Sequence, residues 1–508
     1  MPGIAIVTGA SRGIGRAIAH RLAKDDFRVA LNDLPSAKEA LEGVKSEIIE
    51  SGGEAAVYYA DVSNEDDVQA MVADVVSTMG GVDVMVANAG LCVTKVLIDT
   101  KREDFERLFA VNVNGTFFCY KHAAIQMIKQ GRGGRIIGAS SAAGKQGFSF
   151  LSGYSATKFA VRGLTQAAGD QKRIIVRRTK ADLTDIAQAA ELAPHGITVN
   201  AYAPGMVDTS MARLTGGMDA LRWRRDEELR LRVEWNQETL SHWQKDPIQR
   251  QHKENMPGTA IITGASRGIG RAIAYRLSKD GFRVALNDLP SAKDALEGVR
   301  REIAESGGDA GIYHADVSNE ADIQAMVADV SRTMGGVDVM VANAGLCTTK
   351  VLVDTTREDF ERLFAVNVNG TFFCYKHAAI QMIKQGRGGR IIGASSVAGK
   401  QGSPFVSGYS ATKFAIRGLT QAAAAELVPH GITVNAYAPG VVDTPMGDGL
   451  LSGIKAEQER IHTSSDPTAN ARILTPEDIA GMVSYLASKE ARMVTGQSMS
   501  INGGMFCD

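Results

Sequence analysis

The chain of 508 residues contains one long sequence twice. Residues 1–168 align without a gap to residues 256–423 at a constant offset of 255, and roughly 143 of these 168 positions are identical. A repeat of this length is a duplicated domain rather than a short-repeat solenoid. We therefore expect two domains of the same fold, each large enough to form its own hydrophobic core.

The two copies diverge in their later parts. Copy 1 carries an insert at residues 169–188, whereas copy 2 passes directly from Ala423 to Ala424. Beyond residue 211 the copies share nothing, and copy 1 enters a charged stretch that holds all three tryptophans. A retained intron inside a fusion of two neighbouring genes would produce the same pattern. We expect three regions: copy 1 at residues 1–211, a charged linker at 212–255, and a complete copy 2 at 256–508.

Composition limits the possible partners. The formal net charge is -1, with 56 Lys and Arg against 57 Asp and Glu, and no basic block is present. Binding to nucleic acid or to an anionic membrane needs clustered basic residues, so we expect a small-molecule ligand instead. Apolar runs such as Val82–Ala87 are too short to span a bilayer, and no basic and apolar leader begins the sequence, so we expect a cytoplasmic protein.

The five cysteines are an odd number without a CxxC pair. No histidine lies close enough to any of them to complete a set of metal ligands, so we expect reduced, mostly buried thiols and no metal site.

Each copy alternates strand patterns with helix patterns, which predicts an α/β fold. Helical periodicity covers residues 14–22, 37–49 and 105–128. We predict two tandem Rossmann-type, doubly wound parallel-sheet domains, with the ligand at the carboxyl ends of the strands. In copy 1 the buried parallel strands are expected at residues 4–8, 28–32, 55–60, 82–87, 135–139 and 197–203.

A glycine-rich turn follows the first strand of each copy. Alone, this turn is a weak signal, but its position in a strand-turn-helix unit favours a dinucleotide whose pyrophosphate lies at the helix N-terminus. The residues expected to bind the cofactor here are Gly9, Ser11, Arg12, Gly13, Ile14 and Gly15 in copy 1, and Gly264, Ser266, Arg267, Gly268, Ile269 and Gly270 in copy 2.

The second strand of each copy ends in an acid, Asp33 or Asp288. A carboxylate there can accept both ribose hydroxyls of an adenosine and would repel a 2′-phosphate, which favours NAD over NADP. Arg12 and Arg267 act in the opposite sense, since a basic residue in the glycine turn could pair with that phosphate. The acid lies directly at the ribose, so we predict NAD; the alternative for Asp33 is an ordinary acid at a strand end.

Tyr and Lys stand four residues apart in both copies, one helical turn from each other. One such pair is unremarkable by chance. Here, however, a Ser lies 13 residues before each Tyr, just past a predicted strand, and an Asn lies in the preceding helix. The candidate catalytic residues are Asn112, Ser141, Tyr154 and Lys158 in copy 1, and Asn367, Ser396, Tyr409 and Lys413 in copy 2.

Together these motifs resemble the short-chain dehydrogenase/reductase family, over essentially all of copy 2 and most of copy 1. The resemblance implies Tyr as the acid/base, Lys on the nicotinamide ribose, Ser on the substrate oxygen and Asn holding a relay water. A Lys cation beside the phenol is expected to lower the pKa of the Tyr. The resemblance adds cofactor-binding residues in copy 1 at Asp61, Val62, Asn88, Ala89, Gly90, Pro204 and Gly205, and in copy 2 at Asp316, Val317, Asn343, Ala344, Gly345, Pro439 and Gly440.

Copy 2 is similar to the diacetyl/acetoin reductases, also called butanediol dehydrogenases, in residues 409–421, 431–440 and the tail 503–506. The chain departs from that branch beside the catalytic Ser, at Ala142 and Val397, and after the Pro-Gly turn, at Asp208 and Asp443. We expect NAD(H)-dependent reduction of a small ketone such as diacetyl or acetoin. The alternatives are a 3-oxoacyl-thioester or sugar-alcohol reductase of the same family, and a non-catalytic nucleotide-binding scaffold for copy 1.

Copy 1 lacks the counterparts of two segments of copy 2. Residues 443–475 are expected to form a substrate lid and residues 497–501 a final strand, so copy 1 would have an open pocket and an unpaired sheet edge. We therefore expect copy 2 to be the competent enzyme and copy 1 to be impaired. The family implies pairing through long helices, either as a homo-oligomer or as a pseudo-dimer within the chain. The stretch after residue 211 predicts either a solvated charged helix or a surrogate strand through Leu229, Leu231, Val233 and Trp235.

Overall fold

The computed structural model describes residues 2–169, 191–205, 258–461, 468 and 471–506. Almost all of the predicted insert, the charged linker and the possible surrogate strand lie outside these residues, as does Asp208. No helix in the described ranges is long and apolar enough to cross a membrane.

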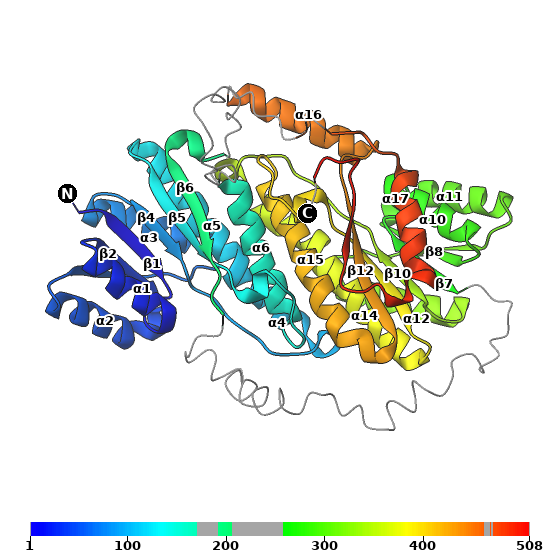
Figure 1. The fold of residues 1–508 in the computed structure, drawn as a ribbon, viewed down its shortest axis with the longest axis horizontal. Helices are drawn as coiled ribbons and strands as arrows, with labels where there is room; N and C mark the ends of the chain where they lie inside the picture. Colours follow the sequence, from blue (N-terminus) through cyan, green and yellow to red (C-terminus); the bar gives the residue numbers. More distant parts are fainter. Residues whose placement is uncertain (1, 170–190, 206–257, 462–467, 469–470, 507–508) are drawn as a thin grey trace, which may run out of the picture.

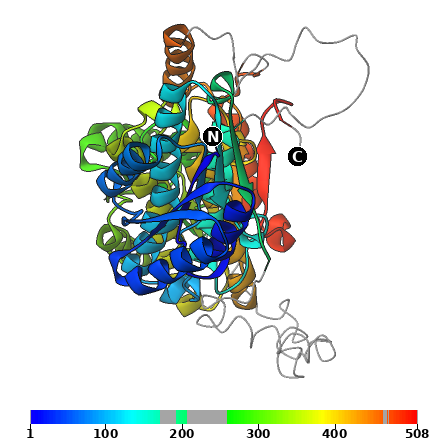
Figure 2. The ribbon, with the colours of Figure 1, turned by 90° about the vertical axis from the view of Figure 1, so that its left-hand side faces the viewer.

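Copy 1 folds around a six-stranded parallel sheet in the order β3-β2-β1-β4-β5-β6 (Figure 1). Figure 2 looks at the molecule from the side of copy 1. The strands are β1 (Ile4–Thr8), β2 (Arg28–Asp33), β3 (Glu54–Tyr59), β4 (Val84–Ala87), β5 (Gly134–Ala139) and β6 (Ile197–Tyr202). The helices are α1 (Gly13–Lys24), α2 (Lys38–Glu50), α3 (Glu65–Met79), α4 (Arg102–Phe109), α5 (Gly115–Gln130) and α6 (Ser152–Ala168).

Copy 2 repeats this sheet and adds a seventh strand, in the order β13-β12-β11-β10-β7-β8-β9. Its strands are β7 (Thr259–Thr263), β8 (Arg283–Asp288), β9 (Ala310–His314), β10 (Val339–Ala342), β11 (Gly389–Ala394), β12 (Ile432–Pro439) and β13 (Ser498–Ile501). Its helices are α10 (Gly268–Lys279), α11 (Lys293–Glu305), α12 (Glu320–Met334), α13 (Arg357–Phe364), α14 (Gly370–Gln385), α15 (Ser407–Leu427), α16 (Pro445–Arg460) and α17 (Pro476–Ala487). The predicted tandem of two doubly wound parallel sheets is confirmed.

The predicted helix at residues 105–128 is interrupted near its start. A π-helical turn at Ala110–Asn114 joins α4 to α5, and a second one at Ala365–Asn369 joins α13 to α14. Such turns often occur at functional sites because the widened backbone redirects one side chain. Here each turn carries the candidate Asn.

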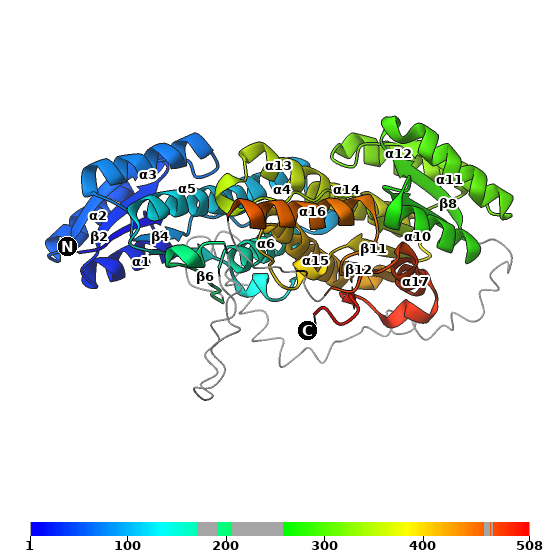
Figure 3. The same ribbon diagram turned by 90° about the horizontal axis from the view of Figure 1, so that it is seen from above.

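The two copies pack against one another through their central helices, which lie side by side in Figures 1 and 3. The ring of Phe105 stacks on Phe372 with centroids 4.0 Å apart, and Phe117 stacks on Phe360 at 4.1 Å. The backbones also approach closely, because a Cβ on Gly418 of α15 would lie 2.6 Å from the ring of Phe159 on α6. Within the chain the copies thus form a pseudo-dimer; the oligomeric state of the whole protein stays a prediction.

The outer edges of the two sheets differ. In copy 2, β12 pairs with β13, and α17 packs on α10, where Ile273 and Leu277 are fully buried. In copy 1, β6 is the edge strand of the described sheet, and the matching Ile18 and Leu22 of α1 are only partly buried. Among the described residues of copy 1 nothing takes the place of α17 and β13, and these two side chains keep some exposure.

Candidate active site

The glycine-rich turn brings the start of α1 against the end of β1. Gly9 has a φ of 66°, a left-handed conformation that favours glycine. A Cβ on Gly15 would lie 2.1 Å from the carbonyl oxygen of Gly9, so only glycine permits this contact. Gly264 and Gly270 repeat both features in copy 2. The first N–H groups of the helix therefore face the carboxyl ends of the strands, where an anion is favoured.

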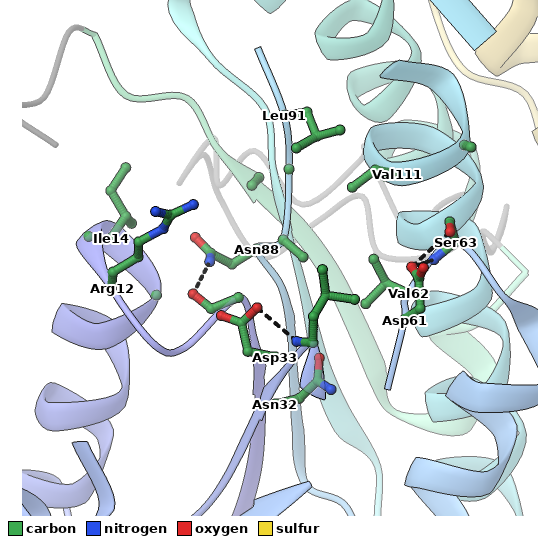
Figure 4. Close-up of a pocket in the computed structure, with 18 of the residues that line it drawn as sticks. Arg12, Ile14, Asn32, Asp33, Asp61, Val62, Ser63, Asn88, Leu91 and Val111 are labelled. Carbon is green, nitrogen blue, oxygen red and sulfur yellow. Dashed lines mark hydrogen bonds between the residues drawn. The ribbon is translucent and has the colours of Figure 1, made fainter. Parts of the chain in front are cut away.

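A cavity of about 370 Å³ opens at this edge of the copy 1 sheet (Figure 4). Ser11, Asn112, Ser141 and Gly205 are the predicted site residues of copy 1 that do not line it. The structure brings the following predicted residues together along its wall: Gly9, Arg12, Gly13, Ile14, Gly15, Asp33, Asp61, Val62, Asn88, Ala89, Gly90, Tyr154, Lys158 and Pro204.

Asp33 is held in a defined position at the end of β2. Its Oδ2 accepts hydrogen bonds from Ser11 N at 3.2 Å and Ser11 Oγ at 2.6 Å. Ser266 makes the same pair of contacts to Asp288 in copy 2, at 3.3 and 2.6 Å. In Figure 4, Arg12 and Asp33 lie on the side of the cavity opposite Asp61. Ser11 therefore positions the acid rather than lining the cavity.

Asp61 and Asp316 shape the turn that follows β3 and β9. The Oδ1 of Asp61 accepts hydrogen bonds from Ser63 N at 2.9 Å and Ser63 Oγ at 2.7 Å. The equivalent contacts from Ser318 to Asp316 are 2.9 and 2.8 Å. This local ring of hydrogen bonds turns Val62 toward the cavity.

Asn88 and Asn343 tie the first and fourth strands of each copy together. Asn343 Nδ2 donates to the carbonyl oxygen of Thr263 at 2.7 Å, and the hydroxyl of Tyr437 donates to Asn343 Oδ1 at 2.7 Å. Asn88 is held in the same way by Tyr202 at 2.6 Å. These two tyrosines were not predicted from the sequence, where their one signal was a place in the last residues of a predicted strand.

Tyr409 and Lys413 stand one turn apart on α15, and their side chains lie close together. Lys413 Nζ lies 5.3 Å from the centroid of the Tyr409 ring and donates to the carbonyl oxygen of Ala394 at 2.8 Å. In copy 1 the Lys158 to Tyr154 distance is 5.4 Å. The predicted proximity of Tyr and Lys is therefore present in both copies.

Burial controls the pKa values of this pair. It lowers the pKa of Lys413 to about 8, because the ammonium is removed from water. It raises the pKa of Tyr409, while a hydrogen bond with Ser396 lowers it in part. In copy 1 burial raises the pKa of Tyr154 to about 12. The expected lowering of the Tyr pKa by Lys is thus wrong for this structure, since desolvation of the phenolate dominates.

Asn367 braces the helix that carries Tyr409. Its Oδ1 accepts from Leu346 N at 2.7 Å, and its Nδ2 donates to Thr412 Oγ1 at 3.1 Å. Thr412 Oγ1 in turn donates to the carbonyl oxygen of Tyr409 at 2.7 Å. Asn112 makes the same contacts in copy 1. Both polar atoms of the side chain are engaged by the protein, so a relay water held by Asn stays a prediction.

A second cavity, of about 100 Å³, lies beside Ser396 and Tyr409 in copy 2. Val397, the residue next to the candidate Ser, also lines it. The predicted lid contributes α16, which supplies Met446, Leu450 and Ile454 to the wall. No charged side chain is among the described residues that line this cavity.

Comparisons with known proteins identify the family of the chain. A family model described as short chain dehydrogenase matches residues 3–176, and one described as enoyl-(acyl carrier protein) reductase matches residues 264–506. A short-chain dehydrogenase/reductase from Armillaria gallica is 52% identical over 251 residues, which cover 49% of this chain and 96% of that protein. The chain belongs to the short-chain dehydrogenase/reductase family. It is therefore an oxidoreductase.

Two other relatives in this family carry more specific names. An L-2,3-butanediol dehydrogenase from Corynebacterium glutamicum is 42% identical over 256 residues, which cover 49% of this chain and 99% of that protein. A 3-oxoacyl-(acyl-carrier-protein) reductase from Staphylococcus aureus is 39% identical over 251 residues, with coverage of 49% and 99%.

The short-chain dehydrogenase/reductase family typically binds NAD or NADP, and the residues of the larger cavity fit such a cofactor. Glycine lets the backbone pass closely at the start of α1, Asp33 offers carboxylate oxygens to sugar hydroxyls, and Lys158 offers a cation beside Tyr154. These donors and acceptors suit a nucleotide with ribose and phosphate groups.

Proposed function

We propose that copy 2 catalyses the NAD(H)-dependent reduction of a small ketone or diketone such as diacetyl or acetoin. In the reverse direction it oxidises a secondary alcohol such as 2,3-butanediol. The observation that carries this proposal is the small cavity beneath α16 that holds both Ser396 and Tyr409 and has no charged side chain among the described residues of its wall.

The residues of copy 2 account for the proton and the developing charge. The Tyr409 hydroxyl donates its proton to the carbonyl oxygen, and the Ser396 hydroxyl donates a hydrogen bond to the same oxygen as it gains charge. Lys413, in its protonated form, stabilises the phenolate that remains on Tyr409. The chemistry that a nicotinamide cofactor would supply, when bound, is the hydride that reduces the carbonyl.

The wall of the cavity favours a small, weakly polar substrate. Val406, Val441 and Leu450 are among the apolar side chains that line it, and its volume of about 100 Å³ suits a molecule of a few heavy atoms. A polyhydroxy sugar alcohol would leave several hydroxyls without partners at such a wall, which costs free energy. The relative named L-2,3-butanediol dehydrogenase supports the same substrate class.

We assign NAD rather than NADP to both copies. Asp33 and Asp288 each present a carboxylate at the end of the second strand, where it would repel a 2′-phosphate. Their contacts to Ser11 and Ser266 hold each carboxylate in position before a cofactor binds. Such preorganisation reduces the entropic cost of binding.

For copy 1 we propose an impaired or non-catalytic role. Its cofactor cavity and its Tyr, Lys, Ser and Asn are all in place, but the lid and the final strand of copy 2 have no counterpart among its described residues. The domain limits remain the proposed ones, with copy 1 at residues 1–211 and copy 2 at 256–508.

The decisive assay is NADH oxidation with diacetyl and then acetoin, comparing the intact chain with Tyr409→Phe and Tyr154→Phe. We expect Tyr409→Phe to abolish turnover and Tyr154→Phe to leave most of it, because copy 2 is the proposed catalytic copy. The two substitutions are chemically identical and differ only in the copy they affect, so each is the control for the other. Loss shared equally between them would show that copy 1 is catalytic. Turnover with a 3-oxoacyl thioester and none with either diketone or acetoin would support the reductase of fatty-acid precursors instead.

A further inference from the structure

Glu191 of copy 1 reaches into the substrate side of copy 2. Its Oε1 accepts hydrogen bonds from Phe405 N at 2.7 Å and from Ser407 Oγ at 2.8 Å. Its Oε2 accepts one from Leu352 N. The side chain is buried, and all three donors belong to copy 2. A buried carboxyl group with three donors from another domain stabilises that one arrangement of the two domains.

The segments that Glu191 holds flank the catalytic helix of copy 2. Ser407 is the first residue of α15, two positions before Tyr409. Lys350 N donates to the carbonyl oxygen of Phe405 at 2.7 Å, and an isolated bridge joins Lys350 to Val406. The carboxyl group of Glu191 therefore binds both segments that this bridge joins, one through Leu352 N and the other through Phe405 N.

Phe405 has a backbone conformation that needs support. Its φ is 66°, in the left-handed region that a side chain other than glycine adopts at a cost of about 1 to 2 kcal/mol. Such strain persists only where surrounding contacts determine the conformation. The hydrogen bond to Glu191 and the burial of the ring provide these contacts.

The ring of Phe405 connects this contact to the lid. It is 1% exposed and packs in a small apolar cluster with Val351 and with Ile454 of α16, while Leu450 packs on the edge of that cluster. Leu450 and Ile454 also line the substrate cavity. One layer of side chains thus separates Glu191 of copy 1 from the pocket of copy 2.

The end of α6 adds a second contact to the same loop. Gln166 Oε1 accepts a hydrogen bond from Gly402 N at 3.3 Å. A Cβ on Gly402 would lie 2.5 Å from Ala167 N, so the loop runs directly against α6. The next residue, Ser403, lines the substrate cavity.

Copy 2 makes the reciprocal contact with copy 1, through Glu426 of α15. Its carboxyl group accepts from Leu97 N, Phe150 N at 3.1 Å and Ser152 Oγ at 2.6 Å. Phe150, the counterpart of Phe405, is 56% exposed. Glu426 thus makes the same contacts as Glu191, but to a copy whose described residues include no lid helix. This makes Glu426 a matched control for Glu191.

We propose that copy 1 completes the substrate pocket of copy 2, with Glu191 as a positioning residue that sets Phe405, the start of α15 and, through Phe405, the lid helix α16. This inference rests on the proposed function, in that copy 2 is taken as the copy that turns over the ketone. It gives copy 1 a role that does not require its own catalysis.

The test compares Glu191→Gln with Glu426→Gln, both in the full chain and both in a Tyr154→Phe background so that only copy 2 turns over. The amide introduced by Glu191→Gln keeps one accepting oxygen but turns a donor toward a backbone N–H. We expect Glu191→Gln to raise the KM for the ketone about tenfold, because one buried backbone N–H loses its acceptor, with a smaller fall in kcat. The KM for NADH is expected to stay unchanged, because the cofactor residues lie elsewhere. Glu426→Gln is expected to leave both constants unchanged.

A second measurement does not depend on turnover. Amide hydrogen exchange at Leu352 and Phe405 is expected to become faster in Glu191→Gln and to stay slow in Glu426→Gln, with both variants as well folded as the parent by circular dichroism. Unchanged exchange at both amides, or a ketone KM equal to that of the parent, would overturn the proposal. If Glu191→Gln speeds exchange at these amides but the parent protein reduces no ketone, the positioning role of Glu191 stands and the proposed substrate class is rejected.

Discussion

Phe150 and Phe405 occupy equivalent positions in the two copies and share a left-handed backbone, with φ values of 63° and 66°. Their surroundings differ: 56% of Phe150 is exposed, whereas only 1% of Phe405 is. The difference arises from α16, whose Ile454 covers the ring of Phe405. Two local sequences that differ at three of five positions, GFSFL at residues 147–151 and GSPFV at 402–406, thus adopt the same strained turn. Among the described residues, a lid helix packs on this Phe in copy 2 alone.

Replacing each Phe by Gly separates backbone strain from packing. Phe150→Gly is expected to change the free energy of unfolding by no more than about 1 kcal/mol, because relief of the left-handed strain offsets the entropy of glycine. Phe405→Gly is expected to destabilise by about 3 kcal/mol, since it removes a fully buried ring. Urea unfolding of the two variants measures both values, and equal losses would contradict the role of α16.

Close helix contact between the copies can be tested at Gly418. Gly418→Ala places a Cβ 2.6 Å from the ring of Phe159 across the interface, so we expect a loss of about 1 to 3 kcal/mol in stability. Gly298→Ala, on α11 with no heavy atom within 4 Å of the new Cβ, is expected to stabilise by about 0.5 to 1 kcal/mol. If Gly418→Ala leaves the free energy of unfolding unchanged in the same urea titration, the copies do not pack as described.

Cofactor preference depends on the acid at the end of β8. Asp288→Asn keeps an oxygen for Ser266 but removes the charge that repels a 2′-phosphate. We expect the ratio of kcat/KM for NADPH to that for NADH to rise by about tenfold or more, as one unfavourable charge contact is worth over about 1.4 kcal/mol. Asp33→Asn in copy 1 serves as the control and should leave this ratio unchanged. A wild-type chain that already uses both cofactors equally would contradict the assignment of NAD.

The pH dependence of stability follows from Glu191. Burial raises the pKa of its carboxyl group from 4.5 to about 7, and the nearby Glu457 of α16 acts in the same direction. The carboxyl group of Glu191 therefore binds its proton more tightly in the folded state than in the unfolded state. The stability that the protonated group contributes is complete below about pH 4.5 and is lost as the pH rises through about 7. We expect the urea midpoint of Glu191→Gln to fall less than that of the parent between about pH 5 and pH 8. Parallel curves for the two proteins would show that Glu191 does not titrate in this range.

Much of the fold was predictable because buried parallel strands form continuous apolar runs. All six predicted strands of copy 1 agree with β1 to β6 to within two residues at either end. The π-helical turn at Ala110–Asn114 was not predicted, since its apolar periodicity differs little from that of an α-helix over five residues. The packing of the copies was left as one of two alternatives, because a helix pattern identifies an apolar face but not the surface that covers it.

The candidate site was predictable where a residue belongs to a local motif. Gly15 belongs to the glycine-rich turn after the first strand, and Tyr409 and Lys413 stand four residues apart, which is about one turn of an α-helix. The direction of the Tyr409 pKa was mispredicted, because desolvation depends on every atom around the phenol and not on its sequence neighbours. The two tyrosines that hold Asn88 and Asn343 were missed for a similar reason, as each lies far along the chain from its Asn.

By itself, the sequence determined that the chain holds two copies of one α/β fold, and it pointed to the Asp and Ser that follow strands and to the Tyr and Lys on a helix as candidate site residues. These features depend on local periodicity and on short motifs. Only the tertiary structure decided that Glu191 supports the pocket of the other copy. The backbone amides it binds lie 161 and 214 residues away, and a single Glu carries no local signal of them. Such contacts form because folding removes both partners from water at the same place, where an unpaired carboxyl or N–H would be costly.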